Sequence, residues 1–217
     1  MQLVLLGAPG AGKGTQGEFL EKEFALVRIA TGDLLRSAMA AGTELGHQAK
    51  TYVSRGELVP DELVTELVKD RLQAPDTARG FILDGFPRNS AQAQSLDEFL
   101  SERRRGTVTA LYLEVDEAAL LKRLTGRRVC PKCGASFHLI NRPPKQEGQC
   151  DVCASQLVQR PDDTEEVIRH RLEVYRRETE PVLDFYAAKG MLKRVDGNGD
   201  LRDIFSRILG ALGADKR

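Results

Sequence analysis

The fold is decided by a short apolar run that breaks into a glycine-rich turn, Leu3-Val4-Leu5-Leu6-Gly7-Ala8-Pro9-Gly10-Ala11-Gly12-Lys13-Gly14-Thr15. A run that ends in glycines and a lysine is typical of a loop that wraps phosphate groups between a strand and a helix. The first backbone N–H groups of the helix have no partner within it, so phosphate oxygens can accept from them while the helix dipole favours negative charge. The stretch therefore predicts a strand, a nucleotide phosphate site and a helix over 13–24.

One position of this loop departs from the usual pattern. Gly14 stands where the pattern has Ser or Thr, and Thr15 follows one place later, so the hydroxyl that usually binds Mg²⁺ is displaced. The loop Gly7 to Thr15 resembles that of the adenylate kinase family. That resemblance implies a Mg²⁺ ion held mostly by phosphate oxygens and water, with acidic residues elsewhere helping to position it.

Length and composition limit the classes of protein. The chain has 217 residues, 41% of them hydrophobic, with no Trp, which suits one soluble core with room for an inserted subdomain. Lys plus Arg equals Asp plus Glu, at 32 each, so no excess positive charge favours nucleic acid or a membrane surface as a partner. The first apolar run is too short for a signal peptide or a membrane span, and we expect a cytoplasmic protein.

Two further junctions carry charged residues. Val27–Ala30 predicts a second strand, followed directly by Thr31 and, five residues later, Arg36. Thr31 fits a simple helix N-cap. Arg36 opposes the helix dipole in the first turns, so an anionic partner explains it better than solvent does. Helices are predicted over 44–54 and 61–72, with a short linker at 55–60.

The segment 81–88, Phe-Ile-Leu-Asp-Gly-Phe-Pro-Arg, is an apolar strand that ends in Asp84 and a turn. Beside a polyphosphate, Asp84 can accept hydrogen bonds from water on a bound Mg²⁺; otherwise it would only stabilise the turn. We expect Arg88 to point into the same opening. Gln92 follows one helical turn later and can share its face.

The rest of the chain alternates strands and helices. An apolar run at 108–115 predicts a central strand of a parallel sheet, and 117–125 predicts a helix that carries Arg123. After a segment without helical period, 163–189 predicts one long helix, 192–196 a last strand, 197–199 a turn and 201–209 a closing helix. The pattern is that of an α/β protein.

All four cysteines lie in the irregular segment, as Cys130-x-x-Cys133 and Cys150-x-x-Cys153. Two such pairs separated by 16 residues match a zinc ribbon, in which four thiolates bind one tetrahedral ion. The alternatives are no metal or a redox dithiol. Four protein ligands leave no position for water, so we expect the Zn²⁺ to be structural and to stabilise a lobe that has few apolar residues.

Taken together, the motifs resemble the adenylate kinase family in its long form with a zinc lid, over nearly all of the chain to about Leu209. They are the phosphate loop and the segments 31–36, 83–88, 124–128 and 160–164. The resemblance implies a core with a five-stranded parallel sheet (1–29, 60–125 and 164–217), an AMP-binding arm (30–59) and a zinc-containing lid (126–163). In the family both arms close over the nucleotides.

The resemblance also assigns residues to the two nucleotides. The ATP side comprises Gly10, Ala11, Gly12, Lys13, Gly14, Thr15, Arg123, Arg127, Ser136, Phe137 and Gly199. The AMP side comprises Thr31, Arg36, Glu57, Leu58, Val59, Gly85, Phe86, Arg88, Gln92, Arg160 and Arg171. The catalytic set is Lys13, Asp84, Arg88, Arg123, Arg160 and Arg171. Phe137 stands where the family often has a tyrosine. Its ring can still stack, but it has no hydroxyl group to make a contact.

The reaction implied is the reversible, Mg²⁺-dependent transfer of a phosphoryl group from ATP to AMP, giving two ADP, by a monomer. Little covalent chemistry is needed beyond positioning and charge neutralisation by arginines. A kinase for CMP, UMP or another small acceptor would share the loop, although Gln92 favours adenine. A zinc-ribbon NTPase that binds nucleic acid would need more basic and aromatic residues around the cysteines. A regulatory module without activity would tolerate losses at Lys13 or the arginines, and none is found.

Overall fold

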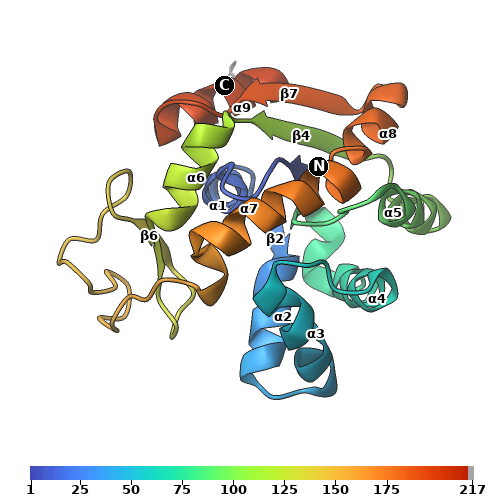
Figure 1. The fold of residues 1–217 in the computed structure, drawn as a ribbon. Coiled ribbons are helices and arrows are strands. Elements are labelled where there is room, and N and C mark those ends of the chain that lie inside the picture. The colour runs from blue at the N-terminus through green and yellow to red at the C-terminus, as the bar shows by residue number, and fades with distance from the viewer. Residues whose placement is uncertain (215–217) are drawn as a thin grey trace.

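The computed structural model describes residues 1–214, and its centre is a five-stranded parallel sheet (Figure 1). The strand order is β2 (Val27–Ala30), β3 (Phe81–Asp84), β1 (Gln2–Leu6), β4 (Thr109–Glu114) and β7 (Leu192–Asp196). Every neighbouring pair is parallel. The predicted α/β fold with a parallel five-stranded sheet is therefore confirmed.

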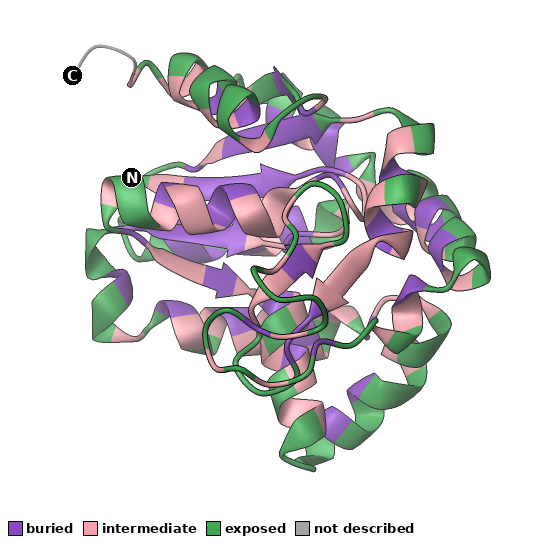
Figure 2. Cartoon of the chain, turned by 90° about the vertical axis from the view of Figure 1, so that its left-hand side faces the viewer, coloured by how far each residue is buried: buried purple, intermediate pink, exposed green. Residues whose placement is uncertain are grey.

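The central strands are apolar because helices cover both faces of the sheet. Alternate residues of β1 face opposite cores: Val4 and Leu6 pack with α4 (Asp61–Leu72), α5 (Ser90–Glu102) and α8 (Val182–Ala188). Leu3 and Leu5 pack on the other face with α1 (Lys13–Phe24), α6 (Glu117–Thr125), α7 (Glu165–Val174) and α9 (Leu201–Leu212). Figure 2 shows the buried strands between these partly exposed helices.

Two short elements extend from the sheet as a helical arm (Figure 1). They are α2 (Thr31–Ala40) and α3 (Glu44–Arg55), which pack against each other. The arm turns tightly because Gly46 lies against the backbone of α2: a Cβ atom there would be 2.2 Å from the carbonyl oxygen of Ala38. Thr43 caps α3 by accepting a hydrogen bond from the Gly46 N–H.

A small lobe follows α6. It contains the antiparallel pair β5 (Arg127–Val129) and β6 (Ser136–His138), and otherwise consists of turns and isolated bridges. Within the described residues its buried cluster has four members, namely Cys130, Phe137, Cys150 and Leu157, whereas Ile140 is 80% exposed. So small a core is a weak basis for an independent fold.

The single long helix predicted over 163–189 is wrong. The 3-10 turn Pro161–Asp163 precedes α7, which begins at Glu165, and a π-helical turn occupies Tyr175–Thr179 before α8 begins at Val182. The Glu180 N–H donates to the Tyr175 carbonyl, five residues back, at 2.9 Å. Pro181 then offers no N–H to continue the helix. The other predicted elements form, with ends that differ by a few residues.

Within residues 1–214, every helix falls short of the length and apolar character that a membrane span requires.

Candidate active site

The phosphate loop takes its shape from glycines. Gly7, Gly10 and Gly12 have φ values of 145°, 86° and 97°, which are costly for residues with a Cβ atom. A Cβ on Gly7 would also lie 2.9 Å from the Leu113 carbonyl oxygen, and one on Gly10 would lie 2.9 Å from Leu124 Cγ. Positions 7 and 10 therefore require glycine for the loop to pack against β4 and α6. Gly12 leads directly into α1.

Lys13 folds back over this loop. Its Nζ donates to the Gly7 carbonyl at 2.6 Å and to the Ala8 carbonyl at 3.0 Å. Burial lowers the pKa of Lys13 to about 8, although the nearby Asp84 carboxylate opposes that shift. An ammonium group that is poorly solvated in this way gains from a bound polyanion.

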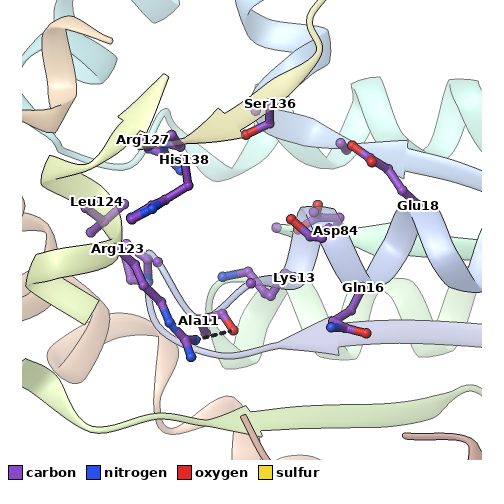
Figure 3. Close-up of a pocket in the computed structure, with 18 of the residues that line it drawn as sticks. Ala11, Lys13, Gln16, Glu18, Asp84, Arg123, Leu124, Arg127, Ser136 and His138 are labelled. Atoms are coloured by element: carbon purple, nitrogen blue, oxygen red, sulfur yellow. Dashed lines mark hydrogen bonds between the residues drawn. The ribbon is translucent and has the colours of Figure 1, made fainter. Parts of the chain in front are cut away.

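A cavity of about 310 Å³ opens in front of the loop. Figure 3 shows Lys13 and Asp84 facing into it from the core, with Arg127, Ser136 and His138 of the lobe across from them. It is lined by all of the residues assigned to ATP and to catalysis: Gly10, Ala11, Gly12, Lys13, Gly14, Thr15, Asp84, Arg88, Arg123, Arg127, Ser136, Phe137, Arg160, Arg171 and Gly199.

Burial lowers the pKa values of four arginines of this cavity. Burial lowers the pKa of Arg88 to about 10, with a smaller contribution from the charge of Arg171. Burial likewise lowers the pKa of Arg160 to about 10 and also lowers the pKa values of Arg123 and Arg171. Cations brought together out of water predict an anionic ligand of high charge.

Two aspartates hold part of this cluster in place. Asp163, which is 0% exposed, accepts from Arg127 Nε at 2.8 Å and Nη2 at 2.6 Å, and from Arg171 Nη1 at 3.2 Å. Asp162 Oδ2 lies 2.9 Å from Arg171 Nη1. A buried carboxylate that is paired twice fixes the directions of both guanidinium groups.

Arg28 is a residue of the site that the sequence prediction missed. It lies on β2 and also lines the cavity, where its Nη1 donates to Asp84 Oδ2 at 3.4 Å. Its Nε atom is buried without a hydrogen-bond partner among residues 1–214. The signal was the pairing of β2 with β3, which places Ala30 beside Asp84, but that register is not visible in the sequence.

A second cavity, of about 70 Å³, lies between the helical arm and the core. Its lining includes Thr31, Arg36, Glu57, Leu58, Val59, Arg88, Gln92 and Arg171. Thr31 Oγ1 donates to the Gly85 carbonyl at 2.8 Å. Of the other residues assigned to AMP, Gly85 and Arg160 line the first cavity, whereas Phe86 is 1% exposed and belongs to the core that the described residues form, outside both cavity linings.

The comparisons with known proteins agree with this geometry. A family model described as Adenylate kinase matches residues 5–191. This chain belongs to the adenylate kinase family. A protein named Adenylate kinase from Thermodesulfovibrio yellowstonii is 55% identical over 98% of this chain and 99% of its own. Proteins of the same name from Caldicellulosiruptor bescii and Clostridium perfringens are 52% and 49% identical, and each match covers at least 99% of both chains.

The long form of the adenylate kinase family is also expected to carry a metal in the lid, and the cysteines fit one. The four Sγ atoms of Cys130, Cys133, Cys150 and Cys153 all lie within 4.8 Å of one another. The closest pairs are 3.4 and 3.5 Å apart, too far for a disulfide and near the edge of about 3.8 Å expected for a tetrahedral Zn–thiolate site. The donor set could therefore hold one Zn²⁺.

Proposed function

We propose that the chain catalyses the reversible transfer of the γ-phosphoryl group of ATP to AMP, giving two ADP. The observation that carries this proposal is that Arg36, Arg88 and Arg171 line both cavities. A group bound in one cavity can thus share these three cations with a group bound in the other. Transfer between two phosphates needs such a shared set of positive charges, because charge spreads over both during the reaction.

The donor would occupy the larger cavity. The N-terminus of α1 and the backbone of Gly10 to Thr15 offer N–H groups to its β- and γ-phosphates. Lys13 would exchange its carbonyl partners, Gly7 and Ala8, for phosphate oxygens. Arg127 and Phe137 would lie near the base, where Phe137 offers an aromatic surface without a hydroxyl.

The acceptor would occupy the smaller cavity, with its phosphate directed toward Arg88. Arg36 is paired with Asp33 at 2.5 Å and is available to an incoming phosphate after a change of side-chain rotamer. Glu57, Leu58 and Val59 form the wall between the arm and the core, and Gln92 would contact the base. No general base is required, because the attacking phosphate oxygen is already ionised.

Catalysis would depend on placement and charge. Arg123, Arg160 and Arg171 converge on the cavity from α6, the end of the lobe and α7, where they can neutralise charge on the transferred group. In comparable enzymes one such arginine is worth about 10³ to 10⁵ in rate. Asp84 would hold water molecules of a nucleotide-bound Mg²⁺, which when bound neutralises phosphate charge.

The lobe and the helical arm would act as the lid (126–163) and the AMP-binding arm (30–59), with the remaining segments as the core. Their closure would exclude water and so suppress hydrolysis of ATP. The four cysteines would hold Zn²⁺ as a structural ion, because no coordination position remains for substrate. We further propose that the enzyme is a cytoplasmic monomer that needs no nucleic-acid or membrane partner.

The proposal is tested by measuring ADP formation from ATP with AMP, CMP, UMP and GMP as separate acceptors in the presence of Mg²⁺. AMP should have the highest kcat/KM. Faster turnover of CMP or UMP would refute the assignment of the acceptor, and turnover of none of the four would refute the reaction itself.

A further inference from the structure

Gln92, at the third position of α5, is held on two sides by groups of opposite chemistry. Its amide oxygen accepts from the Arg88 backbone N–H at 2.8 Å, and its amide nitrogen donates to Asp61 Oδ1 at 2.7 Å. The side chain is almost fully enclosed, at 2% exposure, and yet it lines the smaller cavity. The orientation of this amide therefore has consequences for any base that binds there.

The Arg88 backbone N–H and the Asp61 carboxylate both require the same orientation of the Gln92 amide. A backbone N–H can only donate, so it must face the amide oxygen, and an ionised carboxylate can only accept, so it must face the amide nitrogen. Turning the amide over would place oxygen against oxygen at Asp61 and N–H against N–H at Arg88. Both hydrogen bonds would be lost in a buried place, where unpaired polar groups are costly.

Asp61 is itself fixed. Its Oδ2 accepts from Asn89 Nδ2 at 2.7 Å, and Asn89 Oδ1 in turn accepts from the Gln92 backbone N–H at 2.9 Å. Asp61 also begins α4, where the helix dipole favours a negative charge. The three side chains form a closed ring that joins the start of α4 to the start of α5, and in the described part of the chain Asp61 lies outside the linings of both cavities.

An amide has two N–H groups and an oxygen with two lone pairs. After the bonds to Asp61 and Arg88, Gln92 keeps one N–H and one lone pair for a ligand. Adenine presents an amino donor beside a ring-nitrogen acceptor, which complements an amide in one orientation. Hypoxanthine presents a keto acceptor beside an N–H donor, and so complements the amide only when it is turned over.

We propose that Asp61 is a specificity-determining positioning residue, which holds the Gln92 amide in the orientation that accepts a 6-amino purine and rejects a 6-keto purine. This inference rests on the proposed function, because it concerns the base of the acceptor nucleotide. Asp61 acts through Gln92 and takes no part in phosphoryl transfer.

The substitution Asp61→Asn removes the preference of the Gln92 amide for one orientation, while the side chain at position 61 keeps its shape. The introduced amide would have one oxygen for two donors, the amide nitrogens of Asn89 and Gln92. If that oxygen serves Asn89, the NH₂ group of the new side chain faces Gln92. Each orientation of Gln92 then keeps one hydrogen bond, either to Arg88 or to the introduced amide, so the two become comparable in energy.

The experiment compares kcat/KM for AMP with kcat/KM for IMP in the wild type, Asp61→Asn and Glu62→Gln, each on a single preparation. Glu62 is exposed in the same first turn of α4, so its variant removes the same charge without touching Gln92. Because AMP and IMP are assayed with the same preparation of each variant, the ratio of their kcat/KM values does not depend on the fraction of enzyme that is folded.

We expect the AMP-to-IMP ratio to fall by about tenfold or more in Asp61→Asn, through both slower use of AMP and faster use of IMP, and to stay within about twofold in Glu62→Gln. An unchanged ratio in Asp61→Asn, or an equal fall in both variants, would overturn the inference. A wild type that does not phosphorylate AMP would instead refute the proposed function.

Discussion

Arg28 Nη1 lies 3.4 Å from Asp84 Oδ2, across 56 positions of sequence. The guanidinium also lies 3.8 Å from Asp33 Oδ2 and 3.9 Å from Glu21 Oε2, so three carboxylates surround one cation. Asp84 is the carboxylate that we assign to the water shell of Mg²⁺. Arg28 and the metal would thus compete for the same negative charge.

Replacing Arg28 with Gln should lower the Mg²⁺ concentration that gives half-maximal activity, because the carboxylate would lose a competing cation. An exposed ion pair is worth up to about 1 kcal/mol, and this one is mostly buried, with side chains 19% and 13% exposed, so we expect a decrease of about fivefold or more. The measurement is a Mg²⁺ titration at saturating nucleotide, with the exposed Arg79→Gln as control. A higher Mg²⁺ requirement in Arg28→Gln would contradict the competition.

The pKa of Lys13, lowered to about 8 by burial, predicts how nucleotide binding depends on pH. Phosphate oxygens favour the charged ammonium, so bound ATP raises this pKa. Binding above pH 8 should therefore take up a proton and weaken as the pH rises, whereas near pH 6 it should be independent of this group. Calorimetric titrations at pH 9 in two buffers with different ionisation enthalpies measure the proton uptake, and Lys13→Met should abolish it.

The lowered pKa of Lys13 also affects the stability of the fold, which rises with pH whereas nucleotide binding weakens. The pKa of Lys13 is about 8 in the folded protein, against an ordinary value of 10.5. Between these values the unfolded chain holds the proton and the folded chain does not, so the contribution of this group to the free energy of unfolding rises with pH and is lost as the pH falls through 8. Chemical denaturation at pH 7.5 and pH 9.5 should show a smaller rise in Lys13→Met than in the wild type.

Removing the side chain of Arg88 should affect the acceptor more than the donor. Arg88 lines both cavities, and its Nε donates to the Gly85 carbonyl at 2.8 Å, which leaves its other N–H groups for the acceptor phosphate. The donor phosphates also have Lys13 and the backbone of the phosphate loop. A charged hydrogen bond to phosphate is worth about 1.5–3 kcal/mol. Arg88→Ala should therefore raise KM for AMP by about 10- to 100-fold and KM for ATP much less; equal increases would speak against this placement.

Zinc should govern the stability of the lid and leave the chemistry unaffected. Cys133→Ala removes one of four ligands, so the zinc content should fall well below one ion per chain and Tm should drop by several degrees. The kcat should remain within a few-fold of the wild type at temperatures where circular dichroism shows an intact fold. A folded, metal-free variant with activity reduced by several orders of magnitude would mean that the ion takes part in catalysis.

Local patterns in the sequence were sufficient for the individual strands, the phosphate loop and the cysteine cluster, whereas the five-stranded sheet was implied by the resemblance to the family. Each depends on residues that are close in sequence or on a characteristic spacing. The two Cys-x-x-Cys pairs, for example, are spaced so that four thiols can surround one ion. The apolar strands 3–6 and 81–83 could be predicted because both of their faces are covered, which leaves no place for polar residues.

What the sequence did not predict depends on partners far along the chain. Arg28 reads as an ordinary polar position of a strand until the register of β2 and β3 is known. Asp61 reads as an acidic first residue of a helix, and only the packing of α4 beside α5 brings it to Gln92. The break after α7 was missed because residues 176–180, Arg-Arg-Glu-Thr-Glu, suit the exposed face of a continuing helix, so Pro181 was the only local sign of it.

The order of the strands has a consequence for how the protein is made. Arg123 Nη2 donates to the Gly197 carbonyl at 2.9 Å, immediately after the outer strand β7. During synthesis the phosphate loop leaves the ribosome roughly 10 to 40 s before residue 197 at ordinary elongation rates. The loop packs against β4 and α6, so its full support is present once α6 has emerged, while Arg123 still lacks its anchor at residue 197. The guanidinium of Arg123 is thus fixed in the site only when the last strand has joined the sheet, so a truncated chain that ends before β7 would lack this anchor.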